Sequence, residues 1–268
     1  ESSNTITRWK FMKTIKLSRR HFLAGGLVAL PLASVADALF VEPEWLRVRT
    51  IRLSQDEPAH RFAHITDIHF KGDTDYLRKV VNRINTLSPD FVCFTGDLVE
   101  NQAHIAEALE ILEEIESPLY GVPGNHDYWS GADFDQIARS FRKTGGDWLL
   151  DRNASIRDGK IRLFGATCEQ GINFVPDPEA KNIALIHYPK WIEKLGDGKF
   201  DLTLAGHSHG GQIRIPFFGP LLLPDQVGEY DLGLFETPAG PLYVGAGIGE
   251  FFLNIRFFCR PEIILFEL

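Results

Sequence analysis

The sequence predicts an α/β protein in which two sheets pack together with helices on the outside. Three observations support this fold class. Strand-like and helix-like patterns alternate between residues 60 and 146, as expected for a parallel sheet with right-handed crossovers. Hairpin patterns and short apolar runs dominate from residue 154 onward. The chain of 268 residues, 44% hydrophobic and 24% charged, is long enough for one soluble domain with a large core.

The first half of the domain is predicted to contain three successive strand–helix units. Apolar residues recur at the spacing of one helix face, as in Leu77, Val80 and Ile84. The strands are expected at residues 60–66, 91–95 and 119–122, and the helices at residues 73–87, 105–115 and 133–143.

The second half is predicted to be rich in strands. Asp158-Gly159 lies between two apolar runs, which is typical of a hairpin. The expected strands are residues 154–157, 161–164, 183–186, 202–205, 234–237, 242–245 and 263–267, with a short helix at 190–195. No linker separates the two halves, so we expect one domain of two packed sheets.

Residues 1–38 have the pattern of an export leader. A basic stretch after Met12 is followed by residues 22–36, which carry no charge, and by Ala36-Asp37-Ala38, which fits a cleavage site. Ser18-Arg19-Arg20 resembles the start of a twin-arginine signal. We therefore divide the chain into this extension and a domain at 39–268, and expect export across, or tethering to, the periplasmic side of a bacterial cytoplasmic membrane. A basic amphipathic anchor helix and an uncleaved signal are the alternatives, and residues 1–11 precede the expected start.

Charge and cysteine content argue against nucleic acid as the main partner and against a structure held by disulfides or by zinc–thiolate sites. Residues 1–38 have a net charge of +4 and the whole chain −8, which leaves −12 for residues 39–268. This acidic balance argues against nucleic acid as the main partner. The chain has three cysteines, Cys93, Cys168 and Cys259. Their number and wide spacing fit neither a disulfide framework nor a zinc–thiolate site.

Metal-binding residue types follow five of the predicted strands. In open α/β sheets, ligands bind beyond the carboxyl ends of the strands, so we expect these residues to form one site if the strands lie side by side. The residues are Asp67, His69, Asp97, Asn125, His187, His207 and His209. Taken alone, each of these residues could have a purely structural role, since Asp and Asn are common turn residues and single histidines often lie in cores.

This mixed oxygen and nitrogen set is too large for one tetrahedral site but suits two metals that share a carboxylate. Mn²⁺, Fe, Zn²⁺ and Mg²⁺ would all suit these donors. Two such ions stabilise phosphoryl displacement and lower the pKa of bound water toward about 7. His126 is the candidate proton donor to the leaving oxygen, and Asp127 could orient its ring.

The motifs together resemble the calcineurin-like metallophosphoesterases. They are Asp67-x-His69, Gly96-Asp97, Gly124-Asn125-His126-Asp127, the single His187, and Gly206-His207-x-His209. The resemblance implies a four-layer α/β/β/α sandwich and a dinuclear centre. It implies that one metal takes Asp67, His69, Asp97 and His209, and the other Asp97, Asn125, His187 and His207. His126 would be the acid or would stabilise the transition state.

A narrower likeness concerns exported bacterial phosphodiesterases of the YaeI/YkuE type. It rests on Glu42-Pro43-Glu44-Trp45, residues 206–214 and Cys259-Arg260-Pro261-Glu262. It implies a metal-dependent phosphodiesterase that acts by attack of metal-activated hydroxide, and the twin-arginine export machinery as a partner. A pyrophosphate hydrolase of the UDP-diacylglucosamine type, from lipid A synthesis, is the alternative enzyme. A catalytically silent binding or scaffold protein is the alternative of another class.

The loop at residues 215–224 is unusually apolar for a segment that directly follows a metal-binding turn. The loop could simply be buried. Alternatively, Phe217 and Phe218, together with Phe251 and Phe252, form an apolar lip for a lipid-linked substrate or a membrane surface. A small-molecule phosphodiester remains the other substrate class. Arg214 and Arg256 are candidates for phosphate contact. Tyr128 and Trp129 are candidate pocket residues, with packing as the alternative for both.

Overall fold

The computed structural model describes residues 19–54, 57–167, 174–196, 199–251 and 253–268. The chain forms two compact units, Glu1–Ala36 and Asp37–Leu268. Most of the basic leader stretch, Cys168 and Phe252 lie outside the described residues.

The described part of the first unit is the helix α1 (Arg19–Ala36), with Pro31 inside it. Among the described residues no helix, α1 included, is long and apolar enough to cross a bilayer.

The second unit contains the two packed mixed sheets expected from the sequence, so the predicted fold class is confirmed. The first sheet has the strand order β1-β14-β2-β3-β4-β5, and only the β14–β2 pair is antiparallel. Its strands are β1 (Arg47–Arg52), β14 (Glu262–Glu267), β2 (Arg61–Ile65), β3 (Phe91–Phe94), β4 (Leu119–Gly121) and β5 (Asp147–Trp148).

The second sheet has the order β12-β13-β9-β8-β7-β6, with antiparallel pairs at its two edges. Its strands are β12 (Gly233–Thr237), β13 (Gly240–Val244), β9 (Leu202–Ala205), β8 (Lys181–Leu185), β7 (Ile161–Gly165) and β6 (Arg152–Ile156). A separate short hairpin is formed by β10 (Arg214–Ile215) and β11 (Gly219–Pro220).

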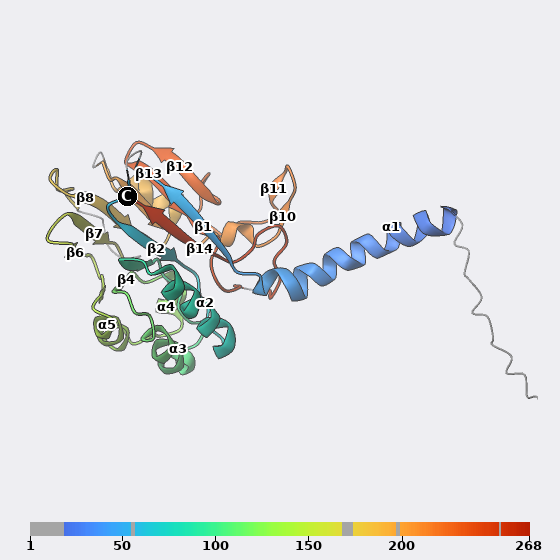
Figure 1. The fold of residues 1–268 in the computed structure, drawn as a ribbon, viewed down its shortest axis with the longest axis horizontal. Coiled ribbons are helices and arrows are strands. Elements are labelled where there is room, and N and C mark those ends of the chain that lie inside the picture. The colour runs from blue at the N-terminus through green and yellow to red at the C-terminus, as the bar shows by residue number, and fades with distance from the viewer. Residues whose placement is uncertain (1–18, 55–56, 168–173, 197–198, 252) are drawn as a thin grey trace, which may run out of the picture. The chain divides into compact units, whose positions relative to one another are not determined.

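Three helices cover the outer face of the first sheet (Figure 1). They are α2 (Thr74–Leu87), α3 (Ile105–Leu112) and α5 (Phe134–Lys143). The apolar face predicted for α2 is buried, with Val80 and Ile84 fully inside. Asp73 caps α2 by accepting a hydrogen bond of 3.0 Å from the Tyr76 amide, which satisfies one of the free N–H groups at the helix start.

Apolar side chains fill the space between the two sheets. Phe62 stacks on Phe91 and on Phe266, with ring centroids 4.9 and 5.0 Å apart. Leu163 and Ile183 of the second sheet belong to the same buried cluster. The outer face of the second sheet is covered by the 3₁₀ helix η4 (Pro189–Lys194), where the sequence predicts a short helix, and by loops. This packing holds the carboxyl ends of the central strands of both sheets near each other.

Candidate metal centre

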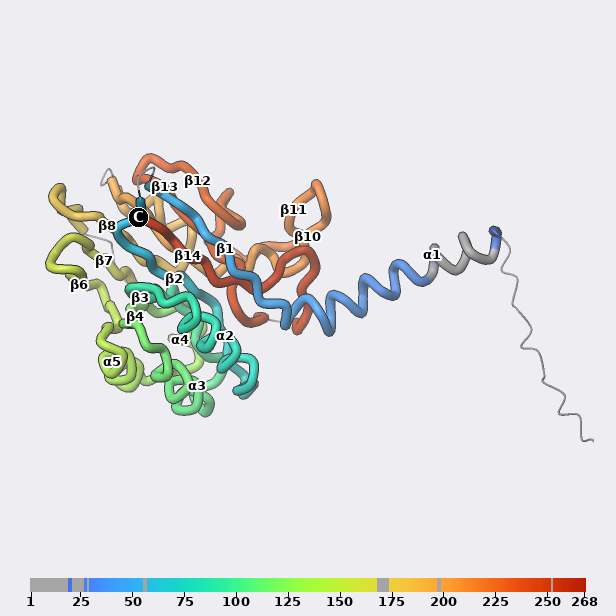
Figure 2. The backbone as a smooth tube through the Cα atoms, in the orientation of Figure 1, coloured from blue at the N-terminus to red at the C-terminus, as the bar shows by residue number. Residues whose placement is uncertain are grey.

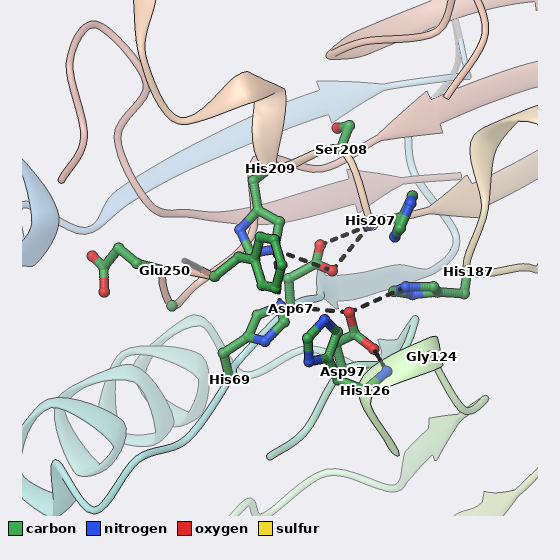
Figure 3. A network of polar contacts seen from close by, with 12 residues as sticks. Asp67, His69, Asp97, Gly124, His126, His187, His207, Ser208, His209 and Glu250 are labelled. Carbon is green, nitrogen blue, oxygen red and sulfur yellow. Dashed lines mark hydrogen bonds and ion pairs between the residues drawn. The ribbon is translucent and has the colours of Figure 1, made fainter. Parts of the chain in front are cut away.

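The seven predicted ligand residues lie beyond the carboxyl ends of strands from both sheets and converge there. Figure 3 labels six of them, all except Asn125. β2 and β3 are followed by Asp67, His69 and Asp97. β4 leads to the short helix α4 (Asn125–Trp129), and β8 and β9 lead to His187, His207 and His209.

The turns that carry these residues have an unusual backbone conformation. Asp67, His69, Asp97, His207 and His209 all have positive φ, between 44° and 67°. Non-glycine residues rarely adopt this region, and it is found where the surrounding structure imposes it. Backbone bonds fix two of the turns, since the Asp67 amide donates to Gly96 O at 2.9 Å and the His69 amide to Asp97 O at 3.0 Å.

A first group of ligand-type atoms is formed by Asp67, His69 and His209. The Nε2 atoms of His69 and His209 are 2.9 Å apart. His209 Nε2 lies 3.7 Å from Asp67 Oδ1, and His69 Nε2 lies 3.5 Å from Asp97 Oδ2.

A second group is formed by Asp97, His187 and His207, with Asn125 beside it. His187 Nε2 lies 3.2 Å from Asp97 Oδ2 and 3.0 Å from Asn125 Oδ1. The same oxygen of Asp97 therefore faces one histidine of each group. A carboxylate in this position is suited to bridge two cations.

The remaining ring nitrogens of three histidines are held by hydrogen bonds. His187 Nδ1 donates to the Thr95 carbonyl at 2.7 Å, and His207 Nε2 to the Asp225 carbonyl at 2.8 Å. His69 Nδ1 bonds the Glu100 carboxylate. Such bonds select the tautomer that leaves the other nitrogen as a lone-pair donor, as is usual around protein metal sites.

The residues present fit divalent cations. Burial lowers the pKa of His207 to about 3 and that of His209 well below its usual value, which keeps both rings in the neutral, metal-binding form. Burial opposes the charge on Asp97, but His187 and His69 hold its pKa well below the usual range. Burial also opposes protonation of His187, but Asp97 raises its pKa to about 9. The site thus favours a positive charge beside Asp97.

Glu100 is the functional-site residue that sequence reasoning missed. Its carboxylate bonds His69 Nδ1 through one oxygen and lies 3.1 Å from His126 Nδ1 through the other. Burial opposes its ionisation, but these two histidines lower the pKa of Glu100 to about 2. Its only signal in the sequence was an acidic residue three positions after Asp97.

The expectation that Asp127 orients the His126 ring is wrong. The fully buried Asp127 carboxylate accepts hydrogen bonds of 2.8–2.9 Å from the amides of Asp97, Leu98 and Gly124. Both of its oxygens are therefore used to hold the turns after β3 and β4 together. Glu100 occupies the place beside the His126 ring.

A pocket of about 590 Å³ opens above these residues. Its polar part includes His69, Asp97, Asn125, His126 and His207. Its apolar wall comes from Ile213 before β10, from the loop after β11 and from the segment before β14, and includes Leu221, Leu222, Leu223, Phe251 and Leu253. Part of the apolar loop at residues 215–224 therefore lines the pocket.

The four substrate contacts predicted from the sequence are not among the pocket-lining residues. Arg214 is held by Asp231 at 2.8 Å and donates to the Gly210 carbonyl, so its charge is already paired. Tyr128 packs edge-on against Phe134, with the ring centroids 4.9 Å apart. Phe217 and Phe218 lie at the tip of the β10–β11 hairpin and are exposed.

Arg256 is also excluded as a phosphate contact. It is fully buried and donates to the carbonyls of Ala246, Gly249 and Cys259. Of the two candidate pocket residues on α4, Trp129 lines the pocket and Tyr128 does not.

Comparison with known proteins adds the following relationships. The profile of the calcineurin-like phosphoesterase family matches residues 60–211. The chain is 30% identical to the uncharacterized metallophosphoesterase YkuE of Bacillus subtilis, over 94% of this chain and 98% of that protein. It is 26% identical to phosphodiesterase YaeI of Escherichia coli, over 94% of this chain and 99% of that protein. It is 28% identical to the UDP-2,3-diacylglucosamine pyrophosphatase LpxG of Chlamydia trachomatis, over 89% and 94%.

Proposed function

The chain belongs to the calcineurin-like phosphoesterase family and is a metal-dependent phosphoric ester hydrolase, and from this premise we propose that it cleaves phosphodiesters at a dinuclear centre. The observation that carries the proposal is the position of Asp97, whose Oδ2 faces His69 at 3.5 Å and His187 at 3.2 Å. Two groups of buried donors therefore share one carboxylate beneath an open pocket.

The ligand sets that we propose follow from these two groups. Asp67, His69, Asp97 and His209 would hold one ion, and Asp97, Asn125, His187 and His207 the other. Two divalent ions, when bound there, supply a water of lowered pKa and offset the charge of the phosphate. Mn²⁺, Fe, Zn²⁺ and Mg²⁺ remain the candidate ions.

His126 is the proton donor in this proposal. Burial opposes its protonation, but the hydrogen bond to Glu100 and the charge of Asp97 raise the pKa of His126 overall. The bond from Nδ1 to Glu100 fixes the ring, which lines the pocket. A positioned imidazolium of this kind can protonate a leaving oxygen and typically contributes a factor of roughly 10²–10⁴ in rate.

The apolar pocket wall supports a substrate with an apolar or lipid-linked substituent. Leu221, Leu222 and Leu253 face the same cavity as the ligand residues, and binding pockets usually match the polarity of what they hold. The relative named UDP-2,3-diacylglucosamine pyrophosphatase favours the second candidate, a pyrophosphate hydrolase of a nucleotide-linked lipid. That candidate fits poorly with the proposed export, because nucleotide substrates are mainly cytoplasmic.

The proposal includes export or tethering to the periplasmic side of the bacterial cytoplasmic membrane. Its support is the Arg19-Arg20 pair and the uncharged stretch that follows in α1. A phosphodiester, small or lipid-linked, is the proposed partner, and the acidic charge of residues 39–268 argues against nucleic acid.

The proposed function can be tested with the full chain and two soluble substrates. Hydrolysis of bis-p-nitrophenyl phosphate and of p-nitrophenyl phosphate would be measured with Mn²⁺ and with chelator, and bound metal would be counted by elemental analysis. The variants are Asn125→Ala and His126→Ala. We expect metal-dependent cleavage of the diester, lost in both variants, with the metal retained in His126→Ala because His126 is outside both proposed ligand sets.

Three other results would change the proposal. Faster cleavage of the monoester would assign a phosphomonoesterase. In a second assay with lipid substrates, cleavage of UDP-diacylglucosamine, but not of a lipid phosphodiester, would assign the pyrophosphate hydrolase. A chain that binds no metal and cleaves neither substrate would leave the binding or scaffold protein.

A further inference from the structure

The tip of the β10–β11 hairpin presents two aromatic side chains to solvent. Phe217 is fully exposed and Phe218 is 86% exposed. The hairpin stands out from the two sheets (Figures 1 and 2). Neighbouring exposed apolar side chains mark a binding surface when they form part of a larger contiguous patch.

The turn at this tip has an unusual backbone conformation. The Phe218 amide donates to the Ile215 carbonyl at 3.0 Å, which closes a turn with Pro216 and Phe217 at its centre. Phe217 has a φ of 70°, a conformation for which such turns normally use Gly or Asn. The aromatic residue is therefore strained and exposed at once, and the described fold gives it no packing in return.

The tip continues into a larger exposed apolar area, which we call the docking face. Its main members are Phe40, Phe217, Phe218, Leu222, Leu253 and Phe258. The chain segments that carry most of them are joined by backbone hydrogen bonds. Arg256 N donates to Ala38 O at 3.0 Å, Phe257 N to Gln212 O at 2.9 Å, and Leu221 N to Ile213 O at 2.9 Å.

The docking face is continuous with the pocket above the candidate metal centre. Leu222 and Leu253 belong to both, since they line the pocket and are also exposed. An apolar substituent bound along Leu222 and Leu253 would therefore lie partly on this face and partly in the pocket.

Two further features indicate what covers this face. Residues 39–41, which are exposed and belong to it, follow shortly after the uncharged stretch of α1 in the chain. Beside Phe258, the Arg260 guanidinium lies 3.8 Å from the centre of the Trp45 ring and donates to the Trp45 carbonyl. Trp and Arg side chains with one apolar and one polar end are enriched at the membrane–water interface.

We propose that the docking face binds the surface of a lipid bilayer, with the Phe217–Phe218 tip inserted and the pocket mouth at the membrane. This inference rests on the proposed function only in its choice of a lipid-linked substrate. A protruding tip suits a deformable bilayer better than a second copy of the chain, because a stable dimer buries about 800 Å² of complementary surface on each partner.

The experiment places an environment-sensitive dye at the tip of the full chain. Phe217→Cys is labelled in a Cys168→Ser background, since Cys93 and Cys259 are buried. Val175→Cys is the matched control, because Val175 is 85% exposed and lies outside the docking face. The probe is a vesicle of phosphatidylethanolamine and phosphatidylglycerol. We expect a blue shift of the emission at position 217 and none at position 175.

The second measurement compares the cleavage of a lipid diester in vesicles with the cleavage of a soluble diester. We expect Phe217→Ser/Phe218→Ser to lower cleavage of a diester lipid in vesicles by about tenfold or more, because two exposed aromatic anchors are lost. Cleavage of bis-p-nitrophenyl phosphate should stay unchanged, as should both activities of Val175→Ser.

The outcomes separate this inference from the proposed function. A label at position 217 that stays in water on vesicle-bound protein would overturn docking, as would a blue shift without lipid that grows with protein concentration. Equal shifts at both positions would also overturn it. A shift confined to position 217, in a protein that cleaves no diester, would support docking and reject the proposed function.

Discussion

Glu100 connects two histidines that have different proposed roles. One carboxylate oxygen bonds His69, a proposed metal ligand, and the other bonds His126, the proposed acid. The rings of His69 and His126 also pack edge to face, with centroids 4.8 Å apart. A change at Glu100 should therefore disturb both functions without removing any ligand.

Glu100→Gln keeps the size of the side chain but removes its charge and one of its two acceptors. We expect activity on bis-p-nitrophenyl phosphate to fall by roughly 10–100-fold, the usual loss when a residue that positions a metal ligand is changed. Steady-state kinetics with saturating Mn²⁺ would measure this. The matched control is Glu110→Gln on the exposed side of α3, which should keep wild-type kinetics, and equal kinetics for the two variants would rule out the positioning role.

His64 is a buried histidine outside the candidate site. Its Nε2 bonds the Thr95 hydroxyl at 2.8 Å, and its Nδ1 has no hydrogen-bond partner. Burial lowers the pKa of His64 to about 3. The ring is thus neutral in the folded protein but becomes protonated in the unfolded chain below its usual pKa of about 6.5.

The sign of the pH effect follows from this difference. Below a pH of about 6.5 the unfolded chain binds a proton at His64 that the folded chain does not, so stability falls as the pH falls. From about pH 7 to about pH 5, His64 should cost roughly 2 kcal/mol of unfolding free energy. Denaturant unfolding of wild type and His64→Gln should show the variant gaining this amount relative to wild type at the lower pH. A constant difference between the two proteins would contradict the shift.

Residue types alone predicted which side chains converge, because Asp, Asn and His after apolar strands are recognisable in the sequence. They did not predict the hydrogen-bond partners. Glu100, Asp127 and Arg214 are all charged residues near metal-binding motifs, yet their contacts differ. Glu100 bonds two site histidines, Asp127 accepts from backbone amides, and Arg214 is paired with Asp231. Only the three-dimensional contacts distinguish these uses.

At the scale of the elements, the turns after β3 and β4 depend on each other. A Cβ on Gly96 would lie 2.3 Å from the Gly124 amide nitrogen, and one on Gly124 would lie 2.1 Å from Asp97 Oδ1. Only glycine allows this approach. Asp127 then joins the two turns by accepting from the amides of Asp97, Leu98 and Gly124.

Asp127→Asn tests this link. The amide keeps one acceptor oxygen but turns an NH₂ group toward backbone donors, which leaves at least one buried N–H without a partner. We expect the free energy of unfolding to fall by about 1–3 kcal/mol, measured by urea denaturation in the presence of chelator. Asp135→Asn, on the exposed first turn of α5, is the control. An unfolding free energy equal to that of the control would mean that the carboxylate does not stabilise the turns.

Apolar patterns predicted most of the elements and missed those that lack such a pattern. The elements that lie within one residue of their predicted bounds are α2, α5, β2, β3, β4, β7, β9, β12 and β14. β1 was not predicted, because its sequence Arg-Val-Arg-Thr-Ile-Arg is that of a charged edge strand. β5 and the β10–β11 hairpin have only two residues a strand, too few to show a period.

At the scale of the whole molecule, the site depends on two sheets that pack face to face, with the carboxyl ends of their central strands beside each other. The sequence predicted both sheets but not their register. The C-terminal strand β14 pairs with β1 and with β2, and the Ile248 amide donates to Thr66 O at 2.9 Å. Contacts between such distant parts of the chain leave no local pattern, so the shape of the pocket could not be predicted.

Because the candidate centre gathers two carboxylates and four histidines in a buried space, metal binding should stabilise the whole fold. Ions that bind only the folded state at about 100 times their Kd add about 2.7 kcal/mol. For a unit of this size, that raises Tm by about 5–10 °C. Scanning calorimetry with Mn²⁺ and with chelator would measure the shift. His187→Ala should lose most of it, because it removes a donor that faces Asp97 at 3.2 Å, whereas His104→Ala should keep it. A Tm that is the same with metal and with chelator would mean that the buried donors do not bind these ions.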